Sequence, residues 1–189
     1  MWRLEPERST NGIPTIILQS RLKADWTRIG VQDWLAKKPD PAIDLAARLR
    51  LDSIRVGSGF RYRLRANPCV TRQGKRFGLM QTLQQEAWIE RKGMELHGFS
   101  LPRLASFDLS ESTQTRPDIG ISEEQMLYGK RRKDGGAVIS LFSVLFDGFL
   151  SVTDPEKFKN ALRFGIGHGK ALGLGLLSIV PVADFPKME

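Results

Sequence analysis

The chain has 189 residues, of which 41% are hydrophobic, enough for one large domain or two small ones with a real core. The single cysteine, Cys69, excludes an internal disulfide, and the two histidines lie too far apart in sequence to suggest a structural metal cluster. No apolar run is long enough for a membrane span and the first residues do not read as a signal peptide, so we expect a cytoplasmic protein without a membrane partner.

Basic residues outnumber acidic residues by 29 to 21, which gives a formal net charge of +8. Such an excess favours a polyanionic partner over a merely charged surface, because cationic side chains release counterions when they meet phosphates. The distribution supports the same interpretation, since basic residues cluster at Arg61–Arg76 and again at Lys130–Lys133.

The first fifty residues predict a hairpin followed by a mostly irregular segment. Trp2–Leu4 and Thr15–Gln19 are expected to be short strands, separated by a turn-rich stretch. Asp25–Asp40 has the mixed composition of a loop, and Pro41–Leu49 is expected to form a short helix.

Strict alternation predicts a half-buried strand at Gly59–Ala66, which ends at Asn67-Pro68 because proline cannot donate to a sheet. Three aligned arginines beside a basic segment favour contact with RNA over a solvated strand face. The apolar face comprises Phe60, Tyr62, Leu64 and Ala66, and the cationic face comprises Arg61, Arg63 and Arg65.

The middle of the chain predicts a basic loop at Thr71–Gly78, which we place at the boundary between two halves, and then a helix at Thr82–His97. Thr82 is the expected N-cap, and a strand is expected near Gly98–Leu109. The course of the polar stretch Ser106–Glu124 is not predicted. The buried side of the helix is expected to include Leu83, Ala87 and Met94.

The C-terminal part predicts two strands within Ala137–Thr153, joined by a tight turn at Asp147-Gly148. A helix then begins with Asp154 as its cap and Pro155 at its first position, and a closing strand follows at Leu176–Val180. Phe158, Ala161 and Leu162 are expected to form the buried face of the helix.

Five glycines fall within the eleven residues 165–175, together with His168 and Lys170. Such a loop exposes backbone N–H groups, which suits the close approach of a phosphate. Because the loop follows a helix and precedes a strand, it has the reverse order of a nucleotide-binding glycine motif. Together, the elements predicted for the second half follow the order helix, strand, strand, helix, strand, which is compatible with a ferredoxin-like βαββαβ unit.

Several segments resemble the CasE family of CRISPR repeat-processing endoribonucleases, subunits of the type I-E Cascade complex. The similar segments are Phe60 to Pro68, Gly74-Lys75-Arg76, Ala87 to Lys92, Phe146 to Asp154, and Gly165 to Ser178. The order and spacing of these segments agree over roughly residues 1–182.

The resemblance implies an α+β fold with tandem ferredoxin-like (RRM-like) domains, here at residues 1–70 and 71–189, the first shortened at its N-terminus. It implies binding of the repeat hairpin of precursor CRISPR RNA and cleavage at the 3′ base of the hairpin, without a metal or other cofactor. The expected products are a 2′,3′-cyclic phosphate and a 5′-hydroxyl. The implied partners are other Cascade subunits, above all the backbone subunit beside the 3′ end of the guide.

The family carries its catalytic histidine on a helix that follows its first strand, and this chain is expected to begin at the second strand. No histidine precedes His97, so no catalytic residue can be assigned. The alternative function is a structural subunit that anchors the 3′ hairpin without cutting it. A structural role at a helix end is favoured for His97.

The predicted RNA contacts lie on the arginine strand, the two basic segments and the glycine loop, while Trp88, Phe142, Phe146 and Phe149 are expected in the core. For His168 the alternative is an exposed loop residue, and for the segment at 130–133 it is a charged tip. The full set of predicted contacts is Arg61, Arg63, Arg65, Asn67, Lys75, Arg76, Arg131, Arg132, Lys133, Gly165, Gly167, His168, Gly169 and Lys170.

Overall fold

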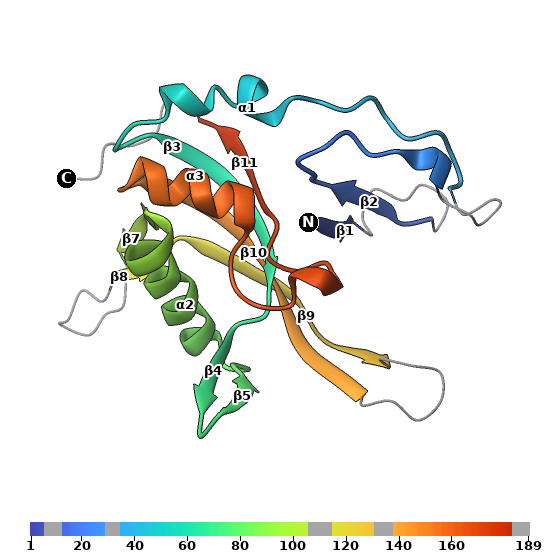
Figure 1. Cartoon of the computed structure of the whole chain (residues 1–189). Helices are drawn as coiled ribbons and strands as arrows, with labels where there is room; N and C mark the ends of the chain where they lie inside the picture. Colours follow the sequence, from blue (N-terminus) through green and yellow to red (C-terminus); the bar gives the residue numbers. More distant parts are fainter. Residues whose placement is uncertain (6–12, 29–34, 106–114, 131–137, 183–189) are drawn as a thin grey trace.

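The computed structural model describes residues 1–5, 13–28, 35–105, 115–130 and 138–182 (Figure 1). Its elements confirm the α+β class, with antiparallel strand pairs and few helices. The predicted contacts Arg131, Arg132 and Lys133 lie outside the described residues. Within the described ranges, no helix is long and apolar enough to cross a membrane.

An antiparallel five-stranded sheet occupies the centre of the molecule. Its strands are β3 (Gly59–Ala66), β6 (Phe99–Ser100), β9 (Ile119–Lys130), β10 (Val138–Val152) and β11 (Leu177–Pro181). The order is β11-β3-β10-β6, and β9 shares with β6 the second edge of β10. The helices α2 (Thr82–Arg91) and α3 (Pro155–Phe164) follow β3 and β10 along the chain, and both pack on one face of the sheet (Figure 1).

The apolar face of β3 is as predicted, but its opposite face is not uniformly solvated. Phe60, Tyr62 and Leu64 are buried, whereas Arg61 is exposed, Arg63 is half-buried and Arg65 is only 6% exposed. β3 precedes the expected domain boundary at residue 70, yet it pairs on its two edges with β10 and β11. Residues 59–66 therefore share one sheet with the C-terminal part of the chain.

The tight turn predicted at Asp147-Gly148 is wrong, because β10 runs unbroken through both residues. The two residues lie opposite Arg63 and Tyr62 of β3. Asp147 accepts a hydrogen bond from Arg63 Nε at 2.8 Å, and a Cβ on Gly148 would lie 2.8 Å from the carbonyl oxygen of Asp118. This dipeptide, which is typical of turns, therefore lies within a strand, where Asp147 forms an ion pair and Gly148 allows a close contact with the neighbouring strand. The hairpin partner of β10 is β9.

Smaller elements flank the sheet. The β1–β2 pair confirms the predicted opening hairpin, and α1 lies within the predicted helix Pro41–Leu49. These elements are β1 (Trp2–Glu5), β2 (Thr15–Leu18), α1 (Leu45–Arg48), the pair β7 (Arg103–Ala105) and β8 (Thr115–Pro117), and 3₁₀ turns at Trp26–Arg28, Leu51–Ser53 and Lys170–Leu172.

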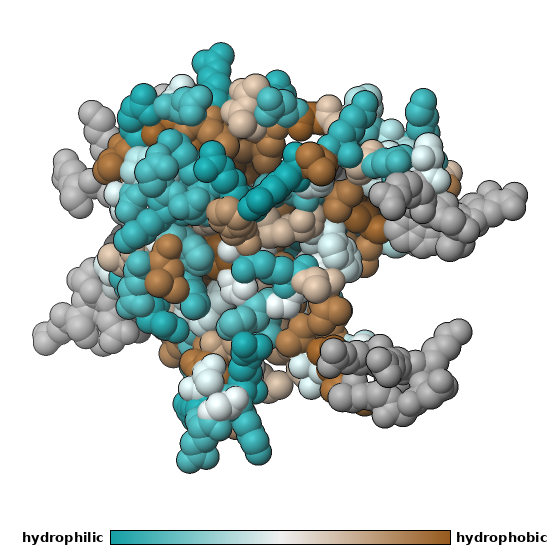
Figure 2. Space-filling model, viewed as in Figure 1, coloured by the Kyte–Doolittle hydropathy of each residue, from teal (hydrophilic) through white to brown (hydrophobic). Residues whose placement is uncertain are grey.

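The loop predicted at Thr71–Gly78 is instead part of a hairpin of β4 (Cys69–Arg72) and β5 (Lys75–Gly78). Its turn residues Gln73 and Gly74 both have positive φ, which matches the right-handed twist of a two-residue hairpin. Figure 2 shows hydrophilic side chains over this hairpin, at the bottom of the view.

Helix α2 buries a different face from the predicted one. It begins at Thr82, with Gln81 rather than Thr82 at the N-cap, and continues into a π-helical turn at Lys92–His97. The side-chain amide of Gln85 donates to the carbonyl of Leu79 at 3.1 Å, and this hydrogen bond allows a polar residue to be buried. The spacing of apolar residues alone could not predict that Gln85 lies on the buried face. The buried residues are Gln85, Trp88 and Ile89, whereas Leu83, Ala87 and Met94 are exposed.

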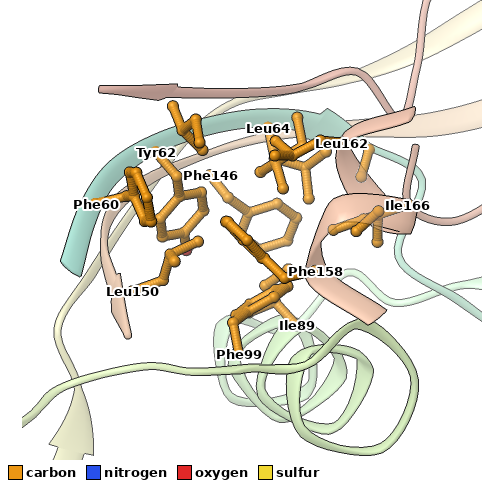
Figure 3. Packing of buried hydrophobic residues seen from close by; sticks show 14 of the residues in the cluster. Phe60, Tyr62, Leu64, Ile89, Phe99, Phe146, Leu150, Phe158, Leu162 and Ile166 are labelled. Carbon is orange, nitrogen blue, oxygen red and sulfur yellow. The ribbon is translucent and has the colours of Figure 1, made fainter. Parts of the chain in front are cut away.

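Helix α3 confirms its prediction. The Asp154 carboxylate accepts from the N–H groups of Glu156 and Lys157, both at 3.1 Å, and Pro155 is the first helical residue. Figure 3 shows the core side chains between the sheet and the helices, where the Phe158 ring lies 5.5 Å from that of Phe60. Trp88, Phe142, Phe146, Phe158, Ala161 and Leu162 are buried as expected, but Phe149 lies on the opposite face of β10 and is 37% exposed.

Candidate nucleic-acid interface

Residues 165–175, which we call the glycine loop, connect α3 to β11 in a tightly folded path. All five glycines have φ between +72° and +86°, the left-handed region that disfavours side chains. A Cβ on Gly165 would lie 2.5 Å from the carbonyl oxygen of Gly175. The glycines are therefore required for the loop to fold closely on itself.

The loop uses many of its backbone donors internally but leaves one edge open. Ile166 N–H donates to Gly175 at 2.9 Å, and Gly175 N–H donates to Arg65 of β3 at 2.7 Å. The N–H groups of residues 167–169 have no partner within the described part of the chain. Consecutive free donors next to left-handed glycines form a concavity suited to an anion.

This open edge borders a pocket of about 330 Å³ between the glycine loop, β4 and the end of α2. We call it the basic pocket. It is lined by Cys69, Val70, Thr71, Trp88, Arg91, Lys92, Gly167 and His168.

The field in the basic pocket is strongly positive. Partial desolvation and the charges of Arg76, Lys92 and Lys170 lower the pKa of His168 below its usual range. Burial, Lys92 and Lys170 lower the pKa of His97 to about 4. Among the described residues, no carboxylate forms an ion pair with Arg76, Lys92 or Lys170, and Arg91 has only the exposed partner Glu95 at 3.9 Å.

The solitary cysteine, Cys69, is a half-buried thiol at the wall of this pocket. Burial raises the pKa of the thiol, although Arg76 and Lys92 oppose that shift. A protonated thiol is a poor nucleophile and a poor metal ligand. Within the described ranges, no group of three or more His, Cys, Asp or Glu side chains could hold a metal ion.

Two of the three arginines of β3, Arg63 and Arg65, form ion pairs away from the pocket, and one partner of Arg63 lies on β1. Arg63 Nε donates to Asp147 at 2.8 Å and Arg63 Nη1 lies 3.3 Å from Glu5, contacts that raise the pKa of the guanidinium. Arg65 forms an ion pair with Glu123. Phosphate contacts by Arg63 and Arg65 thus stay a prediction, and both side chains would have to share their charge with carboxylates.

Arg63→Ala is expected to lower the free energy of unfolding by about 2 kcal/mol, because Glu5 is buried and would lose a cationic partner. Arg61→Ala, at an exposed neighbouring position, should change stability by less than about 0.5 kcal/mol. Urea denaturation of both variants measures the difference. Equal stability of the two variants would refute a structural role for Arg63.

The structure brings together only part of the predicted set. Gly167 and His168 line the basic pocket, whereas the β3 arginines and Asn67 do not. Arg76 and Lys170 do not line it either, but they lie close enough for their charges to lower the pKa of His168. Lys75 is exposed on β5, and Asn67 is 3% exposed. Arg91 and Lys92, which also line the pocket, were not predicted from the sequence. Their signal was a basic pair at the end of a helix, three and four residues after the buried Trp88.

Fold and pocket together describe a basic α+β protein suited to phosphate-rich ligands. The sequence model of the family described as "CRISPR associated protein" matches residues 1–181, and the chain belongs to this family.

Particular relatives confirm the resemblance to CasE. The chain is 36% identical over 189 residues to the CRISPR-associated endoribonuclease Cse3 of Thermus thermophilus, covering 96% of this chain and 79% of the relative. It is 27% identical over 142 residues to the CRISPR system Cascade subunit CasE of Escherichia coli, covering 68% of this chain and 61% of the relative. A solved structure of Thermus thermophilus Cse3 bound to an RNA representing a pre-cleavage complex is also similar, with 32% identity, coverages of 96% and 78%, and a TM-score of 0.69.

Proposed function

We propose that this chain is the CRISPR RNA-processing subunit of a type I-E Cascade complex and binds the repeat hairpin of precursor CRISPR RNA. The main support is the basic pocket, where Lys92 lies beside the N–H groups of residues 167–169 and the charges of Arg76 and Lys170 act on His168. Within the described ranges, these N–H groups have no partner and these three cations have no carboxylate partner. A phosphate there would receive directional donors and uncompensated charge. Arg61, the β4–β5 hairpin and the segment at 131–133 would extend the contact along the RNA backbone.

The strand order supports tandem ferredoxin-like domains as the finer description of the fold. In the order β11-β3-β10-β6, with helices after β3 and β10, residues 59–181 have the βαββαβ arrangement of one such unit. The second unit would then begin at β3, and the β1–β2 hairpin would belong to the first. The proposed complex is cytoplasmic, and its other Cascade subunits would include the backbone subunit beside the 3′ end of the guide.

In the proposed reaction the ribose 2′-OH attacks the adjacent phosphorus, and the bond to the 5′-oxygen of the next nucleotide breaks. A 2′,3′-cyclic phosphate forms, and the leaving oxygen gains a proton to become a 5′-hydroxyl. Lys92, Lys170 and the free N–H groups would stabilise the negative charge that accumulates on the phosphate oxygens.

A second candidate function is a subunit that anchors the hairpin without cutting it. One observation favours this candidate: in the free protein the pKa values of His97 and His168 are both lowered, so both imidazoles are neutral near pH 7 before RNA binds. A neutral histidine can accept a proton from the 2′-OH but cannot protonate the leaving oxygen. We assign no catalytic residue.

Incubating the protein with a 5′-labelled repeat-hairpin RNA in EDTA distinguishes these functions. A discrete product that ends in a cyclic phosphate supports processing, whereas tight binding of intact RNA supports anchoring. Failure to bind the hairpin more tightly than an unstructured RNA of equal length, over a range of salt concentrations, would refute both.

Hairpin binding should become about three- to tenfold tighter as the pH falls from 8 to 5.5. In the free protein the pKa of His168 is lowered, and a bound phosphate would raise it, so the complex takes up a proton and gains affinity as the pH falls between the two pKa values. His168→Gln should flatten this dependence. His97→Gln is the matched control, because a pKa of about 4 leaves His97 neutral throughout this pH range. A wild-type affinity that is constant with pH would exclude His168 from the interface.

A further inference from the structure

Strand β1 and Met1, the residue before it, contact the glycine loop at its start and middle and bind Leu176, the residue after it. These contacts lie away from the open edge at residues 167–169. We propose that Trp2 and Arg3 of this strand are positioning residues that keep the glycine loop in its phosphate-binding shape. The inference rests on the proposed function for its RNA readout, but the loop geometry can be measured without RNA.

Trp2 supports the middle of the loop. Its indole Nε1 donates to the carbonyl of Ala171 at 3.3 Å, within the 3₁₀ turn that also contains Lys170. Its ring lies against Gly173, where a Cβ would approach ring atoms at 2.7 to 3.0 Å. The absence of a side chain at Gly173 is therefore explained by its contact with Trp2, and the turn that bears Lys170 lies directly on β1.

Arg3 fixes the end of the loop. The side chain is 2% exposed, and its Nη1 donates to the carbonyl of Leu176 at 3.1 Å and to that of Arg63 at 3.2 Å. Glu5 forms an ion pair with the Arg3 guanidinium. An apolar side chain could fill this site without the cost of desolvating a charge, but it could not join the two carbonyls. Arg3 thus ties the exit of the glycine loop to the central strand of the sheet.

Met1, the residue before β1, covers the start of the loop. A Cβ on Gly165 would lie 2.5 Å from Met1 Sδ, so this thioether packs directly on the backbone where α3 ends. With contacts at Gly165, Ala171 and Leu176, Met1 and β1 together constrain the loop on both sides of the open edge. Weakening these contacts should therefore disorder the N–H groups of residues 167–169 while the core of the protein stays folded.

The test uses Trp2→Phe, which retains an aromatic ring against Gly173 but lacks the indole donor. Amide exchange at Leu172 and Leu174, measured in the free protein, should accelerate about tenfold, while exchange at the core residue Phe146 stays unchanged. Affinity for the repeat-hairpin RNA should fall about fivefold, and the slope of log Kd against log salt should decrease by about one. Trp26→Phe, an equal change at a 38%-exposed tryptophan in another turn, should alter neither quantity.

Arg3→Lys is the second variant, because it retains the charge opposite Glu5 but cannot bind both carbonyls with a guanidinium fork. It should accelerate amide exchange at Gly175 by a similar factor. Unchanged exchange at Leu172, Leu174 and Gly175 in both variants would overturn the inference. If the wild-type protein failed to bind the hairpin, the proposed function would fall, while the exchange rates would still decide whether β1 positions the loop.

Discussion

Replacing Lys92 and Lys170 together by glutamate is expected to weaken repeat-hairpin binding by about a hundredfold to a thousandfold at moderate salt. Both ammonium groups lower the pKa values of His97 and His168, so both act on the same small volume. Neither has a carboxylate partner in the described part of the chain, so their charge is available to a phosphate. A charge-assisted hydrogen bond to phosphate contributes about 1.5–3 kcal/mol, and glutamate adds repulsion.

Fluorescence anisotropy across a salt series measures this effect. The slope of log Kd against log salt should fall by about 1.5, because two phosphate contacts are lost. The matched control is the double variant Lys23→Glu and Lys37→Glu, which changes the net charge equally at exposed positions outside the basic pocket. An equal loss of affinity in the control would mean that net charge, not the pocket, determines binding.

Gly165→Ala is expected to have a large effect on stability, lowering the free energy of unfolding by about 3 kcal/mol. Two energetic penalties of a Cβ, one conformational and one steric, add at this position. The backbone has φ of +72°, and a Cβ would meet the carbonyl oxygen of Gly175 at 2.5 Å, an atom that cannot move without opening the loop.

Gly57→Ala separates the two costs. Gly57 has φ of +84°, but a Cβ there would meet nothing within 4 Å, so only the conformational cost of about 1 kcal/mol applies. Urea denaturation of both variants gives the comparison. Equal destabilisation would show that the loop relaxes freely around a methyl group and that its close packing is not needed.

Local patterns in the sequence predicted those elements whose determinants are local. The alternation in Gly59–Ala66 predicted β3, and the Asp154-Pro155 cap with Phe158 and Leu162 predicted α3 and its buried face. The order expected for the second half, helix, strand, strand, helix, strand, counted two strands within Ala137–Thr153, where the structure has the single strand β10. The turn at Asp147-Gly148 failed because pairing with β3, more than 80 residues earlier in the chain, overrides a dipeptide preference.

The candidate site was harder to predict, because its charges interact over long sequence separations. Glu5 and Asp147 lie 58 and 84 positions from Arg63, and no local pattern reveals that they share its guanidinium. The glycine loop and Lys170 were visible in the sequence. Arg91 at the end of α2 and Lys92 at the start of the π-helical turn line the pocket together with residues of β4 and of the glycine loop, which are distant in sequence. Glycine density predicted a phosphate loop, whereas contacts with β1 and with Trp88 explain several of those glycines.

The most direct test of a phosphate site at the basic pocket is an NMR titration of the ¹⁵N-labelled protein with repeat-hairpin RNA. The amides of Gly167, His168 and Gly169 should show large downfield shifts and new protection from exchange, since these N–H groups have no partner in the described part of the free protein. Binding that leaves these three amides unshifted, with changes confined to the β3 face around Arg61, would contradict the account.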